Sequence, residues 1–395
     1  MKSHISTILL IIMFALMTNT AQSLVIITYV KHDATGLNNG TSWANAYTSL
    51  ETALTAAISG DIIWVAAGTY KPTSDHGLNI PSPNTERGYH FRMKNYVKIY
   101  GGFAGNEPSS FNLTLRNFVL NETILSGDIG IVGDNSDNCF HVFYHPELGL
   151  KSYSNNQTLV DGFTITGGKA NSTGDHGYGG GFFNNGDDIY ISNCIIQDNY
   201  ALRGAGMYNL NDADPSLRNC LITGNTAIVC GGGIFNKDGS SADFFNSTIC
   251  KNVAGNGGGI YCETGSGSYL YNTIVWANTA TSVTNPGNQI YLYGGTSKIN
   301  YSCYSNGAED VYVFSPGNYT DFEVSNSITN DPKFVDPDNG DYRIPGNSPC
   351  ADAGSNVYIE SPFQVIAQDI RGFGFGRKLN KTDGTTGIFD MGVYE

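Results

Sequence analysis

Charged side chains are scarce in this chain, and basic ones are scarcer than acidic ones. They make up 14% of the 395 residues, and 21 lysines and arginines stand against 35 aspartates and glutamates, which gives a formal net charge of −14. An acidic surface repels a phosphate backbone, so this balance excludes nucleic acid as an expected partner. The acidity suits calcium binding or simple solubility instead.

Apolar segments of membrane-spanning length are also missing. Residues 1–23 contain an apolar run at 8–17, with a basic start at Lys2 and small residues at 21–23. The run is too short to cross a bilayer comfortably, and the arrangement is typical of a cleaved signal peptide, with an uncleaved anchor as the alternative. No later segment is apolar enough to span a membrane. We therefore expect a mature protein that is secreted, extracellular or at the cell surface.

Glycine is abundant, and its clusters recur at a fixed distance. The pattern of glycines, an apolar residue and an aromatic residue appears in "GGGFFNN" (179–185), "GAGMYN" (204–209), "GGGIFN" (231–236) and "GGGIYC" (257–262). An Asn-x-Ala element keeps the same period of roughly 26 residues, which is the signature of a solenoid. Each unit holds two short apolar stretches of strand length, so stacked units would form parallel ladders with about 4.8 Å between coils.

Equivalent positions of the units should then form columns along the solenoid axis. Two columns are apolar throughout and should point inward: Ile165, Ile196, Ile222, Ile249 and Val275, and Phe182, Met207, Ile234, Ile260 and Ile290. Asparagine columns at the corners are expected to adopt left-handed backbone geometry and to hydrogen-bond along the axis. They are Asn184, Asn209 and Asn236, and Asn199, Asn225, Asn252 and Asn278. We expect roughly ten coils, about 50 Å in length.

These repeats resemble the right-handed parallel β-helix of pectin-lyase-like proteins, and in detail the repeats of polymorphic outer-membrane proteins. The opening at 38–72, "NNGTSWANAYTSLETALTAAISGDIIWVAAGTYKP", is similar to the start of many such proteins. The end, with "DPKFVDPDNGDYRIPGNSPCADAGSN" (331–356), "DIRGFGFGR" (369–377) and "FDMGVYE" (389–395), resembles the choice-of-anchor Q type of C-terminal module. The resemblance implies an all-β solenoid over 24–330 with an N-terminal cap, and a module over 331–395 packed on the end of the solenoid.

The N-terminal cap is expected to contain an amphipathic helix over 48–59. Thr48 and Glu51 would form a capping box. The apolar face would consist of Leu50, Ala53, Leu54, Ala57 and Ile58. Such a helix would cover the open end of the core, where a terminal coil leaves strand edges unpaired.

An acidic row follows the asparagine corners on successive coils. It consists of Asp187, Asp188, Asp212, Asp214, Asp238 and Glu263. Stacking would bring these carboxylates into steps of about 5 Å, which suits a calcium site or paired carboxylates for glycoside hydrolysis. The alternative is a solvated rim of turn-forming aspartates. His176 with Asp187 or Asp188 is the weak catalytic alternative, and no other catalytic or cofactor-binding set is evident.

An aromatic column lies one position after the inward apolar column. Its members should therefore point outward, where they could bind sugar rings or a partner protein, or stack on one another to stiffen the sheet. They are Phe183, Tyr208, Phe235, Tyr261 and Tyr291.

The cysteines suggest packing more than metal binding. No Cys-x-x-Cys spacing occurs among the eight, which leaves a zinc site without support. Cys194 and Cys220 share a column, and this spacing suits either a disulfide or two stacked apolar side chains.

The sequence thus favours a secreted or cell-surface protein with a non-enzymatic role in adhesion, structure or glycan binding. A surface polysaccharide or other surface proteins would be its partners, and calcium is the one ion that the acidic row suggests. The alternative is a polysaccharide lyase or glycoside hydrolase, because the resemblance implies a fold that such enzymes use, although fold alone is weak evidence for activity.

Overall fold

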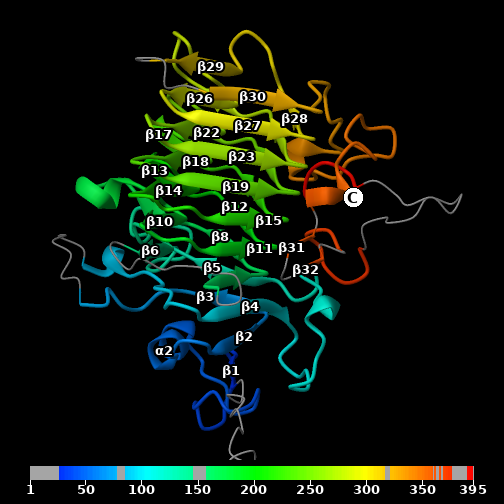
Figure 1. The fold of residues 1–395 in the computed structure, drawn as a ribbon. Helices are drawn as coiled ribbons and strands as arrows, with labels where there is room; N and C mark the ends of the chain where they lie inside the picture. Colours follow the sequence, from blue (N-terminus) through cyan, green and yellow to red (C-terminus); the bar gives the residue numbers. More distant parts are fainter. Residues whose placement is uncertain are drawn as a thin grey trace, which may run out of the picture.

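Parallel β-strands stacked into a solenoid dominate the molecule (Figure 1). The computed structural model describes residues 26–77, 85–145, 157–315, 321–358, 368–375 and 389–394, together with two short strands at 360–361 and 364–365. The predicted signal peptide (1–23) lies outside these residues, as do 376–377 and Glu395 of the C-terminal motifs. The solenoid has about six complete turns, which confirms the predicted all-β parallel β-helix.

Each complete turn contributes one strand to each of four sheets, which we call A to D. Sheet A consists of β1 (Ile27–Val30), β2 (Ile62–Ala66), β4 (Lys98–Phe103), β7 (Leu159–Asp161), β11 (Tyr190–Ser192), β15 (Ser216–Arg218), β19 (Ser241–Phe245), β23 (Gly267–Tyr271), β27 (Thr296–Asn300) and β30 (Asp321–Ser325). Sheet B consists of β3 (Gly68–Tyr70), β5 (Thr123–Ser126), β8 (Thr164–Thr166), β12 (Ile195–Gln197), β16 (Leu221–Thr223), β20 (Thr248–Cys250), β24 (Ile274–Trp276) and β28 (Cys303–Tyr304).

Sheets C and D complete the turn between sheet B and the next strand of sheet A. Sheet C consists of β6 (Phe143–His145), β10 (Phe182–Asn185), β14 (Met207–Leu210), β18 (Ile234–Asn236), β22 (Ile260–Cys262), β26 (Ile290–Tyr293) and β29 (Val311–Phe314). Sheet D consists of β9 (Lys169–Ala170), β13 (Tyr200–Arg203), β17 (Thr226–Cys230), β21 (Val253–Ala254) and β25 (Thr279–Ala280). Sheet A has ten strands, which matches the expected number of coils. About six turns are complete, however, because the other sheets have fewer strands.

The strand register reproduces the predicted apolar columns. Ile196 pairs with Ile222, and Ile222 pairs with Ile249 on the next coil. In sheet C, Met207 pairs with Ile234 in the same way. All five side chains are fully buried in one continuous core, so the inward direction of both columns is confirmed.

Corner asparagines divide into two groups with different roles. The predicted residues form hydrogen-bonded ladders: Asn225 Nδ2 donates to Asn252 Oδ1 at 2.9 Å, and Asn209 Nδ2 to Asn236 Oδ1 at 2.7 Å. The expected left-handed backbone occurs elsewhere, at the corner between sheets A and B, where φ lies between 48° and 55°. That group consists of Asn193, Asn219, Asn246 and Asn272.

Glycine is required at the turn into sheet C for two separate reasons. Gly231 has a φ of 68°, which L side chains rarely adopt. At Gly233 a Cβ would stand 2.6 Å from the carbonyl oxygen of Gly259 on the next coil. The repeat therefore keeps glycine because one position turns the chain and another lets two coils approach.

Helix α2 (Leu50–Ala56) covers the N-terminal end of the core, as predicted (Figure 1). Its boundaries differ from the expected 48–59, and Ser49 rather than Thr48 is the N-cap, because Ser49 Oγ accepts the Thr52 N–H at 3.4 Å. Four of the five expected face residues are buried, whereas Ile58 is 71% exposed because the helix has ended before it.

The described residues of the C-terminal segment, at 331–358, 368–375 and 389–394, lie along the flank of sheet B, where Figure 1 shows them beside the middle coils. We expected this segment on the end of the solenoid. Its contacts instead run along the coils: the Tyr342 and Thr223 hydroxyls are 2.8 Å apart, and Gly392 N–H donates to Asn272 O at 2.7 Å. Ser355 N–H also donates to Asn272 Oδ1 at 2.7 Å. Apolar side chains of this segment pack on the outer face of sheet B and bury it.

Candidate functional site

The acidic row does not converge on one point. Asp187 is fully buried, and its carboxylate lies 3.9 Å from His145 Nδ1. Asp188 and Asp214 accept backbone N–H groups from the next coil, at 3.1 Å and 2.8 Å. Asp212 and Asp238 are exposed and have left-handed φ of 56° and 50°, as expected of turn-forming aspartates.

A calcium site would need several of these oxygens around one ion. Within the described part of the chain, no three histidine, cysteine or acidic side chains come together in a way that could hold a metal. Glu263, the last member of the row, is half-buried, and burial raises the pKa of its carboxyl group. The arrangement of the row thus favours the alternative of turn-forming aspartates and does not support a calcium site at this rim.

His176 and Asp187 lie on opposite faces of sheet C. The ring of His176 stacks on Phe140 with 5.0 Å between centroids, and its Nδ1 is 3.1 Å from Nε2 of His141, outside the core. Asp187 instead lies next to His145, whose Nδ1 contacts Asn184 Oδ1 at 3.2 Å on the inner side. The structure therefore does not assemble the catalytic alternative that the sequence suggested.

The aromatic column forms a continuous ladder outside the core, as predicted. Neighbouring rings stack with interplanar angles of 12° or less and centroid distances between 4.8 and 5.6 Å. Phe183, Tyr208 and Phe235 are nevertheless buried, because the chain that leaves sheet D folds over them with Tyr178 and Cys230. Only the last members, Tyr261 and Tyr291, are half-exposed.

Stacking limits what this ladder can bind. Each ring face is occupied by the neighbouring ring, so mainly ring edges reach the solvent. A sugar ring needs the face of an aromatic ring for its apolar contact. The geometry thus favours the alternative in which the ladder stiffens sheet C.

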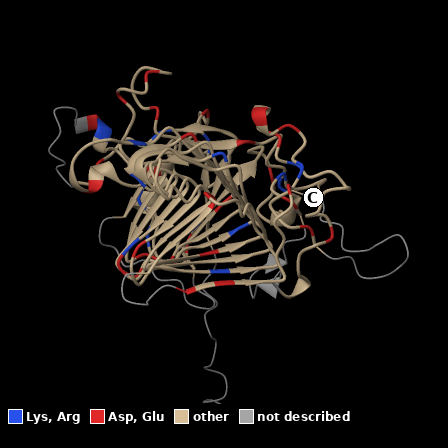
Figure 2. Cartoon of the chain, turned by 90° about the horizontal axis from the view of Figure 1, so that it is seen from above, with Lys and Arg blue, Asp and Glu red and all other residues tan. Residues whose placement is uncertain are grey.

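The outer face of sheet A presents a different set of side chains, which the sequence pattern did not reveal. Looking along the solenoid axis, Figure 2 shows charged residues mostly at corners and in loops, with a few on the strands of this flat face. Two outward columns cross the later coils. They are Tyr190, Ser216, Asp243, Tyr269, Lys298 and Glu323, and Ser192, Arg218, Phe245, Tyr271, Asn300 and Ser325.

Tyr269 and Phe245 are half-exposed rings on this face. A Cβ at Gly267 would stand 3.4 Å from the Tyr269 hydroxyl and 3.5 Å from Cε2, so the Tyr269 ring leans along the sheet over the glycine. The guanidinium of Arg218 lies 4.3 Å from the Phe245 centroid. We call the patch formed by Ser216, Arg218, Asp243, Phe245 and Tyr269 the sheet A patch.

Polar groups of the sheet A patch are incompletely used by the protein. Among the described residues, the Nε of Arg218 and the Oγ of Ser216 are buried without a hydrogen-bond partner. Burial and repulsion from Asp214 raise the pKa of Asp243 to about 6, while the positive charge of Arg218 has the smaller effect of lowering it. Burial lowers the pKa of Arg218.

All eight cysteines, which belong to the described residues, are buried and free. The thiols of Cys194 and Cys220 contact carbonyl oxygens of their own coils, at 3.1 Å from Ser192 O and 3.3 Å from Arg218 O. Burial raises the pKa of the Cys220 thiol to about 12. The stacked-side-chain alternative therefore holds in the structure. Among the described residues, no helix has the length and apolar character needed to cross a membrane.

Comparison with known proteins yields only distant likenesses. No protein-family model and no curated protein match the sequence. Among solved structures, the chain is similar to "Crystal structure of pectate lyase Pel9A", with a TM-score of 0.38 and 14% identity over 93% of this chain and 96% of that one. A "Rhamnogalacturonan lyase" gives a TM-score of 0.29 and 12% identity over 78% of this chain and 90% of that one. Likenesses of this size carry no argument about activity or substrate.

Proposed function

We propose that this protein is a secreted or cell-surface β-solenoid that binds a glycan through the sheet A patch and does not cleave it. The observation that carries the proposal is the half-exposed ring of Tyr269, which leans over Gly267. No other described ring stacks on it, in contrast to the rings of the sheet C ladder. An aromatic face beside polar groups is the combination that fixes a sugar ring by apolar contact and hydrogen bonds.

The groups around Tyr269 complete the features of such a site. Asp243 contributes a carboxyl group on the strand adjacent to Tyr269, and the guanidinium of Arg218 lies beside the Phe245 ring on the same face. Lys298 on the next strand is tied to Glu323 at 3.0 Å, so it contributes less free charge. The patch spans three adjacent parallel strands of a flat sheet, which suits an extended chain of sugar units better than a single compact ligand.

We also propose that the protein acts outside the cell, in adhesion. It is supported by the apolar run at 8–17 and by the repeats and C-terminal motifs that resemble surface proteins. Other surface proteins are the second class of partner, and the half-exposed Tyr261 and Tyr291 at the end of the sheet C ladder are the surface for them.

A catalytic role is the second candidate, and Asp243 is the specific observation in its favour. A carboxyl group with a pKa near 6 can act as a general acid at neutral pH. Asp214, whose charge contributes to that shift, would be its partner carboxylate. A polysaccharide lyase or glycoside hydrolase would therefore act on the same face.

Affinity electrophoresis against a panel of soluble polysaccharides tests the proposal. We expect retardation by at least one polysaccharide, with Tyr269→Ala weakening binding by tenfold or more, on the order of 1.4 kcal/mol. Tyr291→Ala is the matched control, because it removes a half-exposed tyrosine from the sheet C ladder, and it should bind normally. Retention of full affinity by Tyr269→Ala would refute the site.

Chromatography of the same polysaccharides after prolonged incubation separates binding from cleavage. We expect no shortened products from the wild-type protein. Products that disappear in Asp243→Asn while affinity persists would replace the binding proposal with the catalytic one.

A further inference from the structure

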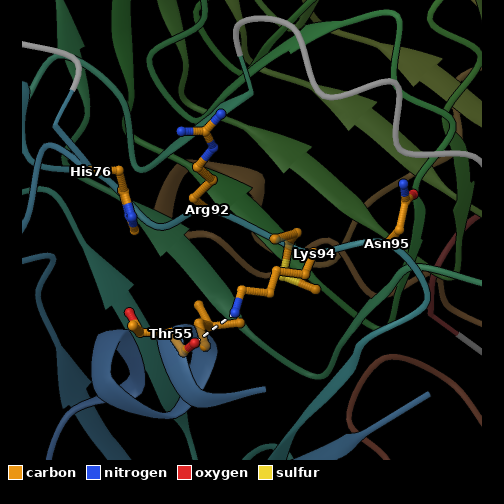
Figure 3. A pocket seen from close by; sticks show the side chains of 7 residues that line it. Thr55, His76, Arg92, Lys94 and Asn95 are labelled. Carbon is orange, nitrogen blue, oxygen red and sulfur yellow. Dashed lines mark hydrogen bonds between the residues drawn. The ribbon is translucent and has the colours of Figure 1, made fainter. Parts of the chain in front are cut away.

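Two segments outside the coils cover the solenoid core, and they meet it through different chemistry. At helix α2 the contact is polar: Figure 3 shows the Lys94 ammonium reaching the carbonyl oxygen of Thr55, at 2.6 Å. The C-terminal segment instead brings Cys350 against the outer face of sheet B, where Cys303 lies on β28. Both cysteine side chains are fully buried at this boundary.

Cys303 points outward from sheet B, toward the C-terminal segment. It pairs in register with Ile274, whereas its neighbour Tyr304 pairs with Val275 of the inward apolar column. Successive residues of a strand point to opposite faces, so Cys303 lies on the outer face. Its thiol donates to the carbonyl oxygen of Asn330 at 3.2 Å, at the start of the segment that covers this face.

Backbone contacts place Cys350 beside it. The carbonyl oxygen of Cys350 accepts the Met391 N–H at 3.0 Å. The next residue, Gly392, lies against the solenoid, since a Cβ there would stand 2.6 Å from Ile274 Cδ1. Ile274 is the register partner of Cys303. The two cysteines therefore pack in one buried cluster with Ile274 and Met391.

The two thiols are also in contact with each other. Hydrogen bonding to the Cys350 thiol, together with burial, raises the pKa of the Cys303 thiol. The thiols of Cys194 and Cys220 differ, because they contact carbonyl oxygens of their own coils. We propose that Cys303 and Cys350 form a disulfide in the mature protein, which joins the C-terminal segment covalently to the solenoid. The proposed location outside the cell enters only as the source of the oxidant, because disulfides persist in oxidising compartments.

The bond forms by thiol–disulfide exchange with an oxidant that itself contains a disulfide. One thiolate attacks the oxidant to give a mixed disulfide, and the second thiolate attacks that bond and joins the two cysteine sulfurs. Cys303 and Cys350 together give up two protons and two electrons, and the oxidant's disulfide takes them up as two thiols. Because both thiols are buried once the segment has docked, the exchange takes place while it docks.

Peptide mapping of the full chain, folded in a mixture of reduced and oxidised glutathione, tests the disulfide. The tryptic peptides 299–333 and 344–371 each contain one cysteine. We expect them as one linked species before reduction and as two separate peptides after it. A maleimide added to the unfolded, unreduced protein should label every cysteine except Cys303 and Cys350. Separate peptides before reduction, or cross-links among the other cysteines only, would overturn the proposal.

Two variants and a protease make the test specific. Cys350→Ser should lose the linked species, whereas Cys194→Ser, which removes another buried thiol, should keep it. Trypsin cleavage of the folded wild type after Lys333 or Arg343, which are both exposed, should leave the two fragments joined until a reductant is added. Fragments that separate without reductant would contradict the cross-link.

Oxidation should also raise the melting temperature of the wild type by roughly 3 °C or more, because a cross-link restricts the unfolded chain, and should leave Cys350→Ser unchanged. If Cys350→Ser did not fold, peptide mapping of the wild type would still decide the question. Glycan binding at Tyr269 uses other residues, so either proposal can fail without the other.

Discussion

Replacing Asn225 by alanine should destabilise the solenoid more than any exposed asparagine replacement. Asn225 is fully buried at the corner after sheet B. Its Nδ2 donates to Ile196 O, Thr223 O and Asn252 Oδ1 at 2.9, 3.1 and 2.9 Å. Its Oδ1 accepts the backbone N–H and the Nδ2 of Asn199, both at 3.1 Å. Alanine removes all five hydrogen bonds.

The loss in the free energy of unfolding depends on which of the remaining groups keep another hydrogen-bond partner. The backbone N–H of Asn199 loses its hydrogen bond to Asn225 Oδ1 and has no other acceptor among the described residues, which costs about 2 kcal/mol for a buried unsatisfied donor. Asn199 Nδ2 keeps Ile165 O and Gln197 O, and Asn252 Oδ1 keeps the Asn225 N–H. At about 0.5 kcal/mol for each of the other four lost hydrogen bonds, the total loss is about 4 kcal/mol.

Urea unfolding followed by far-ultraviolet circular dichroism measures this loss. Asn106→Ala is the control, because Asn106 is exposed and should change the free energy of unfolding by less than about 0.5 kcal/mol. A loss below about 1 kcal/mol in Asn225→Ala, with an unchanged slope, would refute the ladder as a source of stability.

Three further predictions concern other parts of the molecule. Burial lowers the pKa of His145 to about 4 and of His90 to about 3, so both imidazoles stay neutral in the folded protein. Unfolding measured against pH should therefore show that their contribution to stability is complete above pH ~6.5 and is lost as the pH falls, by about 3 kcal/mol for His145 alone at pH 4. Asp243, whose pKa is raised in the fold, should act weakly in the opposite direction. Gly233→Ala places a Cβ 2.6 Å from a backbone oxygen and should cost about 3 kcal/mol in urea unfolding, whereas Gly346→Ala, with nothing within 4 Å, should be nearly neutral. Tyr342→Phe removes the buried contact with Thr223 and should cost about 1 kcal/mol and speed limited proteolysis of the C-terminal segment; unchanged proteolysis would argue against docking through this pair.

Columns of one residue type could be predicted from the sequence because the period fixes which residues pair. Ile196, Ile222 and Ile249 occur at one position of the repeat, and the register places them in contact. The capping helix was also predictable from its apolar face. Its N-cap was not, because Thr48 and Ser49 have nearly the same capping chemistry and only the backbone path distinguishes them.

Predictions about surfaces failed where a neighbouring segment decides exposure. Alternation placed Tyr208 outside the core, but it could not reveal that Tyr178 stacks on that ring at 4.9 Å. The sheet A patch was missed for another reason. Ser216, Asp243 and Tyr269 share a column but not a chemical type, so no repeated pattern marks them in the sequence.

Hydroxyl-radical footprinting with the best-binding polysaccharide tests most directly whether sheet A is the ligand surface. Oxidation of Tyr269 and Phe245 should fall when the polysaccharide is bound, while oxidation of Tyr291 and Tyr293 at the far end of sheet C should stay constant. Protection of Tyr291 and Tyr293 with unchanged oxidation of Tyr269 would place the ligand on the other face and contradict the account.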